Sequence, residues 1–578
     1  MGYDISDYRQ IDERFGNIDD FQELLDDMHK KGLKLIMDFV PNHTSNEHEW
    51  FIASEDPNHP DHEKYKDYYV WRDPNYNSTC HALDENYDYP NNWVSEFNGP
   101  AWEWSEKRGQ YYLHQFLKEQ PDLNLEKEFV VQELIDILDF WLQKGVDGFR
   151  VDAVQYTHEA QHFRDEYPRE EIAALLPPEN NGVYCSSQDS DKNDLYHDFT
   201  RVQPGMHDCL EALRGKLLEY SEEPGVDKVM VTEAYEFDSK QVARYYGTRT
   251  SKESSFPFNF WMLDFFAGNW GKSNDEPEDD DDNTSYNAQT LAQEVIEGWL
   301  AAPSLDSDIY KDREWPNWVL GNHDNPRIVT RTNQIVAESL AVLMLSLPGT
   351  QTLYYGDEIG MVDVDVTEST DEGGINRDKA RAPMQWDNSK WAGFTENENG
   401  PWLPVDETTY HDIVEETNVE KQIDDPSSML NLYKKLIKLN KEHDQLHRGH
   451  YCTFIPSDGD AKSNVFFENN ILAFIREQNG LKTGFMTLIN FNEEEKTVQL
   501  NKADFGEFID LSNDETTIID KSGSEVIENN DGYTVNLARN GYLLAEYKIS
   551  GEQYFERDGA VCYVARETRI SGGVEYAV

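Results

Sequence analysis

The sequence predicts an α/β protein built on a (β/α)8 TIM barrel, because helical and strand-like segments alternate along most of its length. Apolar residues recur at helical spacing from Phe21 to His29, Gly32 ends that helix, and the largely apolar run Leu33–Val40 predicts a strand. The same unit recurs, with helices expected at Leu134–Leu142, Leu210–Tyr220 and Ile335–Leu345, and strands at Phe149, Val229–Thr232 and Thr352–Tyr355. Helices that alternate with short buried strands are typical of parallel sheets, and this regularity favours a barrel.

Length and local composition predict further parts beside the barrel. A chain of 578 residues is too long for one ordinary domain. After His43 the pattern gives way to an aromatic stretch rich in Asn, Asp and Pro, which we interpret as a subdomain inserted over the barrel rim. We expect the barrel at residues 1–44 and 114–445, this inserted subdomain B at 45–113, a C-terminal β-sandwich at 446–550, and a tail at 551–578.

Short segments after residue 440 are the basis for the predicted sandwich. A helix is expected at Leu430–Leu439, and strand-like patterns follow it at Asn464–Phe467, Ile471–Ile475 and Gly484–Asn490. Several short strands in succession are typical of two packed antiparallel sheets.

The charge balance narrows the choice of partner. The chain has 51 Lys and Arg against 112 Asp and Glu, which gives a formal net charge of −61. Such acidity argues against nucleic acid or an anionic membrane surface and favours a neutral small molecule. No apolar run reaches the roughly 18 residues that a membrane helix needs, and the first residues carry no signal-peptide pattern.

The cysteines and possible glycosylation sites bear on location. The five cysteines are not spaced as pairs of zinc ligands, and their odd number leaves at least one thiol outside any internal disulfide. They are Cys80, Cys185, Cys209, Cys452 and Cys562. Asn-X-Ser/Thr triplets begin at Asn42, Asn77 and Asn283, and they favour an exported protein. We therefore expect an extracellular or cell-surface protein.

Three motifs each bring an acidic residue to the end of a predicted strand. They are Gly-Phe-Arg-Val-Asp ending at Asp152, Val-Thr-Glu ending at Glu233, and Gly-Asn-His-Asp ending at Asp324. In a parallel barrel the carboxyl ends of the strands meet at one rim, where catalytic groups gather. Breaking a glycosidic bond needs a carboxylic acid to protonate the leaving oxygen and a carboxylate to meet the oxocarbenium-like carbon. One such residue alone could be a cap or a salt bridge, but three together suggest glycoside chemistry.

These motifs, with Asp38-Phe39-Val40-Pro41-Asn42-His43 and Gln120-Pro121-Asp122-Leu123-Asn124, resemble glycoside hydrolase family 13. Within that family the chain is similar to α-glucosidases, to oligo-1,6-glucosidases and to the related heavy chains of heteromeric amino-acid transporters, from residue 1 to about 550. The resemblance implies a retaining mechanism in which Asp152 is the nucleophile, Glu233 the general acid/base and Asp324 the stabiliser of the transition state.

The proposed roles require Glu233 to be protonated and Asp152 to be ionised before the reaction. A retaining enzyme holds its nucleophile and its acid only about 5–5.5 Å apart. Glu233 must carry a proton at rest, and the neighbouring anion Asp152 favours that state. Arg150 lies two residues earlier on the same face of the strand, so it is expected to keep Asp152 ionised.

Further residues are expected to contact the sugar. His43 and His323 are suited to hydrogen-bond sugar hydroxyls. By resemblance, Tyr3 is a stacking platform for the nonreducing sugar, and Arg327 faces the same subsite. In related enzymes a Val after the nucleophile accompanies α-1,6 cleavage and a smaller residue accompanies α-1,4 cleavage, so Ala153 predicts a preference for maltose-like substrates.

Other residues near the motifs are expected to be structural. Asp38 is interpreted as a brace for the loop that follows it. Tyr354, Tyr355 and Glu358, after the last strand, are expected to serve packing. The tryptophans of the inserted segment are expected in its core rather than as sugar platforms, and they are Trp50, Trp71, Trp93, Trp102 and Trp104.

The start of the chain departs from the family pattern. Met1-Gly2-Tyr3 corresponds to a position after the second barrel strand, so the first two strands are expected to be missing and this truncated chain to be inactive by itself. The family's calcium site lies in the first barrel loop. We therefore expect no cofactor and no metal site in this chain, and membrane anchorage only through the missing N-terminal segment.

Two functions remain open. One is a retaining α-glucosidase that releases terminal α-1,4-linked glucose from maltose and short maltooligosaccharides. The other is a non-catalytic heavy-chain subunit of a heteromeric amino-acid transporter. The fold cannot separate them, but the six residues Asp152, Glu233, Asp324, His43, His323 and Arg150 together favour the enzyme, because a structural subunit has no need of them.

Overall fold

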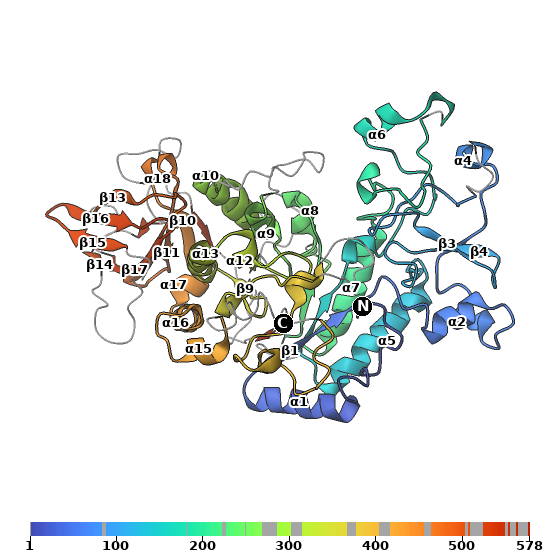
Figure 1. The fold of residues 1–578 in the computed structure, drawn as a ribbon, viewed down its shortest axis with the longest axis horizontal. Helices are drawn as coiled ribbons and strands as arrows, with labels where there is room; N and C mark the ends of the chain where they lie inside the picture. The colour runs from blue at the N-terminus through green and yellow to red at the C-terminus, as the bar shows by residue number, and fades with distance from the viewer. Residues whose placement is uncertain are drawn as a thin grey trace.

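The computed structural model describes residues 2–83, 88–180, 182–221, 227–248, 250–268, 286–301, 315–366, 377–403, 417–455, 464–502, 507–508, 524–549, 553–554, 562–564 and 576–577. Figure 1 shows the C-terminal β-sheets at one side, the barrel strands with their helices in the middle, and small helices and strands at the other side.

Parallel strands form the barrel wall. The strands β1 (Lys34–Phe39), β5 (Gly148–Val151), β6 (Val229–Thr232) and β7 (Phe256–Pro257) pair in that order, and β8 (Asn317–Val319) pairs with β9 (Thr350–Thr352). Gly148 opposes Val229, and a Cβ on Gly148 would lie 2.4 Å from the Val229 carbonyl oxygen, so only glycine allows this approach. The other edge of β1 pairs in parallel with β19 (Tyr576–Ala577).

Long helices pack on the outside of these strands. They are α1 (Ile18–Lys30), α5 (Glu128–Lys144), α7 (Gly205–Glu219) and α13 (Gln334–Ser346). Asn17 and Asp20 form a capping box at the start of α1, and Gly145, at φ 106°, ends α5. The helices predicted at Phe21–His29, Leu134–Leu142, Leu210–Tyr220 and Ile335–Leu345 are confirmed, although α7 ends at Glu219, one residue earlier than predicted. The helix predicted at Leu430–Leu439 lies within α16 (Met429–Glu442).

The helix faces that turn inward are apolar. Leu25 of α1, Leu134 of α5 and Leu213 of α7 are buried with Phe149 of β5 in one core cluster. Burying each such side chain contributes about 1.5–3 kcal/mol. The strand expected at Thr352–Tyr355 is displaced, because β9 ends at Thr352 and the chain turns there into a short 3-10 helix at Asp357–Ile359.

Further α-helices lie in the described part of the chain. They are α2 (Glu49–Glu55), α3 (His62–Tyr65), α4 (Thr79–Leu83), α6 (Glu170–Leu175), α8 (Ser239–Arg244), α9 (Trp261–Phe266), α10 (Ala288–Thr290), α11 (Glu297–Ala301), α12 (Ile328–Arg331), α15 (Val419–Ile423), α16 (Met429–Glu442) and α17 (Asp444–His447). Within these residues, no helix combines the length and the apolar content needed to cross a membrane.

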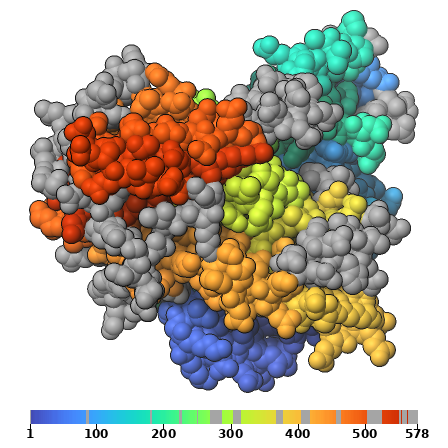
Figure 2. Space-filling view, turned by 60° about the vertical axis from the view of Figure 1, so that its left-hand side comes forward, coloured from blue at the N-terminus to red at the C-terminus, as the bar shows by residue number. Residues whose placement is uncertain are grey.

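Two segments far apart in sequence form a lobe beside the barrel, which we call the rim lobe (residues 45–113 and 157–204). The first segment contains α2, α3, α4 and the small sheet β2 (Trp71–Arg72), β4 (Gln110–Leu113), β3 (Trp102–Ser105), and the second contains α6. A disulfide joins Cys80 to Cys185, and Arg201 forms an ion pair with Glu96. In the space-filling view the segment around α6 stands out from the rest of the molecule (Figure 2).

The core of the rim lobe is aromatic. Trp50, Trp71, Trp93 and Trp102 are buried and Trp104 is half-buried, so the expectation that they serve packing is confirmed for the first four. Among the glycosylation triplets, Asn42 is buried, Asn77 is exposed, and Asn283 lies outside the described residues.

The C-terminal part consists of two antiparallel sheets. One has the order β14 (Glu507–Phe508), β17 (Tyr542–Lys548), β12 (Thr483–Asn490), β11 (Ile471–Glu477), β10 (His450–Thr453) and β18 (Cys562–Val564). The other has the order β13 (Lys496–Asn501), β16 (Gly532–Leu537) and β15 (Glu525–Glu528). A second disulfide joins Cys452 to Cys562 across β10 and β18, and Cys209 is a buried free thiol.

One predicted strand in this part is wrong. Residues expected as the strand Asn464–Phe467 form the helical turn α18 (Val465–Glu468). The Asn464 side chain accepts a hydrogen bond from the Phe466 amide at 3.0 Å and so caps the turn, which local side-chain pattern alone did not reveal. The strands predicted at Ile471–Ile475 and Gly484–Asn490 are confirmed as parts of β11 and β12.

Candidate active site

Parallel pairing brings the predicted carboxylates to one rim. Asp152 directly follows β5 and its amide donates to the Phe39 carbonyl at the end of β1, at 2.9 Å. Glu233 directly follows β6 and its amide donates to the Val151 carbonyl, also at 2.9 Å. These bonds continue the ladder past the strand ends, so backbone geometry fixes the two carboxyl groups side by side. Asp324 comes from the loop after β8.

A single guanidinium connects the first two carboxylates. Arg150 is held on β5, and its side chain is 10 % exposed. Its Nη1 contacts Asp152 Oδ1, and its Nη2 lies 2.9 Å from Glu233 Oε2. Nη1 also donates to Asp38 Oδ1 at 2.9 Å. Arg150 thus bridges the two carboxyl groups, and the Asp152 carboxyl also lies in hydrogen-bonding contact with that of Glu233.

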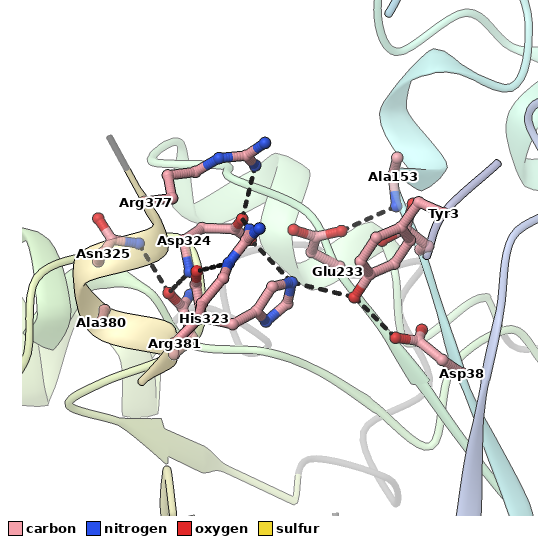
Figure 3. Close-up of polar contacts among 12 residues, drawn as sticks. Tyr3, Asp38, Ala153, Glu233, His323, Asp324, Asn325, Arg377, Ala380 and Arg381 are labelled. Carbon is pink, nitrogen blue, oxygen red and sulfur yellow. Dashed lines mark hydrogen bonds and ion pairs between the residues drawn. The ribbon is translucent and has the colours of Figure 1, made fainter. Parts of the chain in front are cut away.

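The backbone after the nucleophile candidate also contacts Glu233. Ala153 has left-handed backbone angles, φ 47° and ψ 39°, which turn its amide away from the strand. That amide donates to Glu233 Oε2 at 2.9 Å (Figure 3). Non-glycine residues adopt this conformation only at a cost of about 1–2 kcal/mol, so the turn after β5 is strained in order to aim this donor.

The electrostatics of the pair differ from the expectation. Burial and the facing Glu233 raise the pKa of the Asp152 carboxyl well above its ordinary value, and Arg150 opposes this shift without cancelling it. The expectation was that Arg150 keeps Asp152 ionised, but the lowering influence of Arg150 on the pKa of Asp152 is outweighed by burial and Glu233. Two carboxyl groups in such contact titrate as a pair, because adding a second negative charge to a buried site is costly.

Asp324 is in the opposite situation. Burial alone would raise the pKa of Asp324, but His323 and the arginines Arg377 and Arg381 outweigh it and lower that pKa. Arg377 donates to Asp324 Oδ1 at 2.7 Å and Arg381 to the same oxygen at 3.1 Å (Figure 3). Asp324 is thus held as an anion, which suits a group that stabilises positive charge.

Sequence reasoning missed these two arginines. They lie in an irregular 3-10 segment, Arg377–Arg381, which has no strand or helix period to place it on the rim. No local sequence pattern marks them, because they reach Asp324 through the tertiary fold.

Tyr3 lies between Asp38 and His323. Its hydroxyl donates to Asp38 Oδ2 at 2.8 Å and lies 3.0 Å from His323 Nε2, and its ring stacks on the His323 ring at 5.7 Å (Figure 3). Asp38 therefore contacts Tyr3 and Arg150 directly and orients both. Burial lowers the pKa of His323, so its imidazole is neutral and can accept or donate a hydrogen bond near neutral pH.

His43 is buried deeper. Its Nε2 lies 3.1 Å from the Tyr3 carbonyl oxygen and 2.9 Å from the Gln120 amide nitrogen. Burial lowers the pKa of His43 to about 4, so the ring is neutral at pH 7. Through its contact with the Tyr3 carbonyl oxygen, His43 holds the backbone of Tyr3 in place.

Arg327 does not lie where it was expected. Its side chain is 0 % exposed, its Nη1 donates to the Tyr355 carbonyl at 2.6 Å, and its guanidinium packs against the rings of Tyr354 and Tyr355. With no exposed atom it cannot contact a sugar in this arrangement. The family resemblance implied a place at the subsite, whereas here Arg327 packs among Tyr354 and Tyr355.

No group of three or more His, Cys, Asp or Glu side chains in the described ranges is arranged to hold a metal ion.

A profile described as the alpha amylase catalytic domain matches residues 1–449. The chain belongs to the alpha-amylase family, glycoside hydrolase family 13, whose catalytic domain is a (β/α)8 barrel followed by a C-terminal β-sheet domain.

Relatives within the family fall into two groups. The chain is 36 % identical over 493 residues to the amino acid transporter heavy chain SLC3A1 of Homo sapiens, covering 85 % of this chain and 62 % of that protein. It is 35 % identical over 542 residues to Maltase 1 of Drosophila virilis, covering 90 % and 73 %. The chain thus spans less than two thirds of the heavy chains that it matches.

Solved structures agree on the fold. The alpha-glucosyl transfer enzyme XgtA superposes with a TM-score of 0.70 at 28 % identity, covering 95 % of this chain and 89 % of that one.

Proposed function

We propose that the protein is a retaining α-glucosidase that hydrolyses terminal α-1,4-linked glucose from maltose and short maltooligosaccharides. The observation that supports this most is the Arg150 fork, which contacts Asp152 through one nitrogen and Glu233 through the other. A retaining pair is about 5–5.5 Å apart, whereas an inverting pair is about 6.5–9.5 Å apart to admit a water between them. The carboxyl groups of Asp152 and Glu233 also lie in direct hydrogen-bonding contact with each other, which favours the narrower separation.

The mechanism follows from the positions of these groups. Asp152 attacks the anomeric carbon of the terminal glucose while the acid form of Glu233 gives its proton to the leaving glycosidic oxygen. The C–O bond to the leaving sugar breaks and an ester between Asp152 and glucose forms. Glu233, now a carboxylate, then takes a proton from a water molecule. That water attacks the anomeric carbon of the sugar and displaces Asp152, which becomes a free carboxylate again. Two inversions give net retention.

The surrounding residues have distinct proposed roles. The anion Asp324 stabilises the positive charge that develops on the sugar ring. Tyr3 and His323 present a stacked aromatic pair beside Asp38, which suits the face and hydroxyls of the terminal glucose. Ala153 borders the next subsite and is proposed to favour the α-1,4 linkage.

A substitution at the nucleophile tests this proposal. Asp152→Asn should lower turnover of maltose by several orders of magnitude, because the amide cannot form the glycosyl ester. The matched control is Asp139→Asn, on the outer helix α5 and remote from the rim, which should leave turnover unchanged. Turnover by Asp152→Asn within about tenfold of the wild-type value would exclude the proposed nucleophile.

The second candidate, a transporter heavy chain, is supported by the 36 % identity to SLC3A1. It predicts that folded protein shows no turnover of any α-glucoside and forms a stable complex with a membrane transport subunit. Export to an oxidising compartment is part of either proposal, and the two disulfides support it, because such bonds are rare in reducing compartments.

A further inference from the structure

Tyr235 connects two loops of the site. It lies two residues after Glu233, and its ring stacks on Phe260 with centroids 4.1 Å apart. Its hydroxyl accepts hydrogen bonds from the side-chain amides of Asn322, at 3.1 Å, and Asn325, at 3.2 Å. These two asparagines flank Asp324, so one phenol joins the loop that carries Glu233 to the loop that carries Asp324.

Asn322 passes this contact on to Asp324. Its Oδ1 accepts a hydrogen bond from the Asp324 amide at 2.9 Å and another from the Asn325 side chain at 2.9 Å. The backbone of Asp324 is therefore fixed by an asparagine that is itself bonded to Tyr235.

Gln155 makes the matching connection on the other side. It lies on the 3-10 turn Val154–Tyr156, two residues after Ala153, and it is 7 % exposed. Its Oε1 accepts from the Tyr235 amide at 2.9 Å, and its Nε2 donates to the Tyr235 carbonyl at 3.3 Å. One side-chain amide thus pairs with both polar groups of the Tyr235 backbone, as a neighbouring strand would.

The sheet does not supply this connection. β6, which carries Glu233, pairs with β5 and β7, whereas β8, which leads to Asp324, pairs only with β9 among the described strands. Strand pairing therefore fixes Asp152 against Glu233 but not Asp324 against either of them. A link across the rim is needed because displacing a catalytic group by about 1 Å can cost about a hundredfold in rate.

We propose that Gln155 and Tyr235 are positioning residues of this active site. Together with Asn322 and Asn325 they form a clamp that holds the loops of Asp152, Glu233 and Asp324 at fixed separations. The clamp rests on the proposed glycosidase function for its effect on rate, but not for its effect on loop mobility. Nothing in its geometry requires its side chains to touch the sugar.

Two variants separate the halves of the clamp. Gln155→Met keeps the length of the side chain and removes both bonds to Tyr235, which loosens Glu233. The loss in kcat/KM should be about tenfold or more for maltose but below about threefold for 4-nitrophenyl α-glucoside, because nitrophenolate leaves without a proton from Glu233. Tyr235→Phe keeps the ring on Phe260 and frees the Asn322 loop, so both substrates should lose about tenfold alike, since Asp324 acts on the sugar.

Gln445→Met is the matched control. Gln445 is a buried glutamine in the C-terminal part whose Nε2 donates to the Thr483 carbonyl and hydroxyl, so its loss removes two hydrogen bonds remote from the site. It should lower the melting temperature without changing either kinetic ratio. A variant with a merely structural defect would resemble it.

Hydrogen exchange tests the clamp without catalysis. Gln155→Met should speed exchange of the Ala153 amide, which donates a hydrogen bond to Glu233. Tyr235→Phe should speed exchange of the Asp324 amide, which donates a hydrogen bond to Asn322. Neither substitution removes an atom of these two hydrogen bonds. Unchanged exchange at both amides, or a loss of kcat/KM by Gln155→Met that is equal on the two substrates, overturns the clamp. If wild-type protein hydrolyses no α-glucoside, the proposed function fails, and the exchange result still decides whether the clamp exists.

Discussion

Replacing Arg150 should shift the pH range in which the site is active. Its guanidinium contacts three carboxylates, those of Asp38, Asp152 and Glu233, and its side chain is buried. Of the influences on the pKa of Asp152, burial and Glu233 raise it and Arg150 lowers it. Arg150→Met removes the lowering influence while keeping much of the side-chain volume, so the pKa of Asp152 must rise further.

The direction of the shift follows from the contact that is lost. A hydrogen bond to a charged group contributes about 1.5–3 kcal/mol, so losing this one should raise the pKa of Asp152 further. The nucleophile must be ionised to attack. The acid limb of the pH profile of kcat/KM should therefore move to higher pH.

The assay is kcat/KM for 4-nitrophenyl α-glucoside measured from pH 4 to 9 on variants that retain a cooperative thermal transition. Arg150→Lys is the comparison, because it keeps the charge but cannot reach both carboxylates with one planar fork. Its acid limb should move less than that of Arg150→Met. An acid limb that stays at the wild-type pH in Arg150→Met, with only a uniform loss of rate, would refute the electrostatic role assigned to Arg150.

Three further predictions concern other parts of the structure. Wild-type protein should prefer maltose to isomaltose by about 10–200-fold in kcat/KM, since a pocket change of that size is worth about 1–3 kcal/mol. Ala153→Val should reduce this ratio. Equal kcat/KM for the two sugars in the wild type would contradict the prediction. Because folding raises the pKa of Asp152, the folded state loses stability relative to the unfolded state as pH rises above the pKa of the unfolded chain. Asp152→Asn should therefore melt at a higher temperature than wild type at pH 7, and the difference in melting temperature should shrink toward pH 4. A difference that does not depend on pH would count against this. The double variant Cys80→Ser/Cys185→Ser should raise KM more than it lowers kcat, because it removes the disulfide between the two segments of the rim lobe. The double variant Cys452→Ser/Cys562→Ser should lower the melting temperature and leave KM unchanged. The same KM in both double variants would rule out a role for the rim lobe in binding.

The sequence allowed prediction of the elements whose signal is local and periodic. The helix around Leu134 was predictable because its apolar residues recur at helical spacing and Gly145 follows it. Asp152 and Glu233 could be placed at one rim because parallel strands put their carboxyl ends together, and the register of β5 with β6 bears this out. The interpretation of the tryptophans as core residues rested on their large apolar surface.

Other features depend on contacts that no local pattern encodes. The left-handed turn at Ala153 carries no Gly or Asn to signal it, and it exists because Glu233 and the following 3-10 turn hold it. Arg377 reaches Asp324 from an irregular segment 53 residues away in sequence. The partners of Cys80 and Cys452 could not be chosen from spacing, since each is joined to a cysteine more than 100 residues later.

The boundaries of the barrel, subdomain B and sandwich stay predictions, as does the expectation that the first two barrel strands are missing. The direction of the pKa shift at Asp152 could not be anticipated, because it depends on how completely the site is buried. A strand-face argument identifies Arg150 as a neighbour but does not measure the burial that outweighs it.

The anomeric form of the first product tests the central claim most directly. Proton NMR during the first minutes of maltose hydrolysis distinguishes α-glucose from β-glucose before the two interconvert. The Arg150-bridged pair of Asp152 and Glu233 predicts that the glucose released from the nonreducing end appears first as the α-anomer. Initial release of β-glucose from that end would show an inverting enzyme and contradict the double-displacement mechanism.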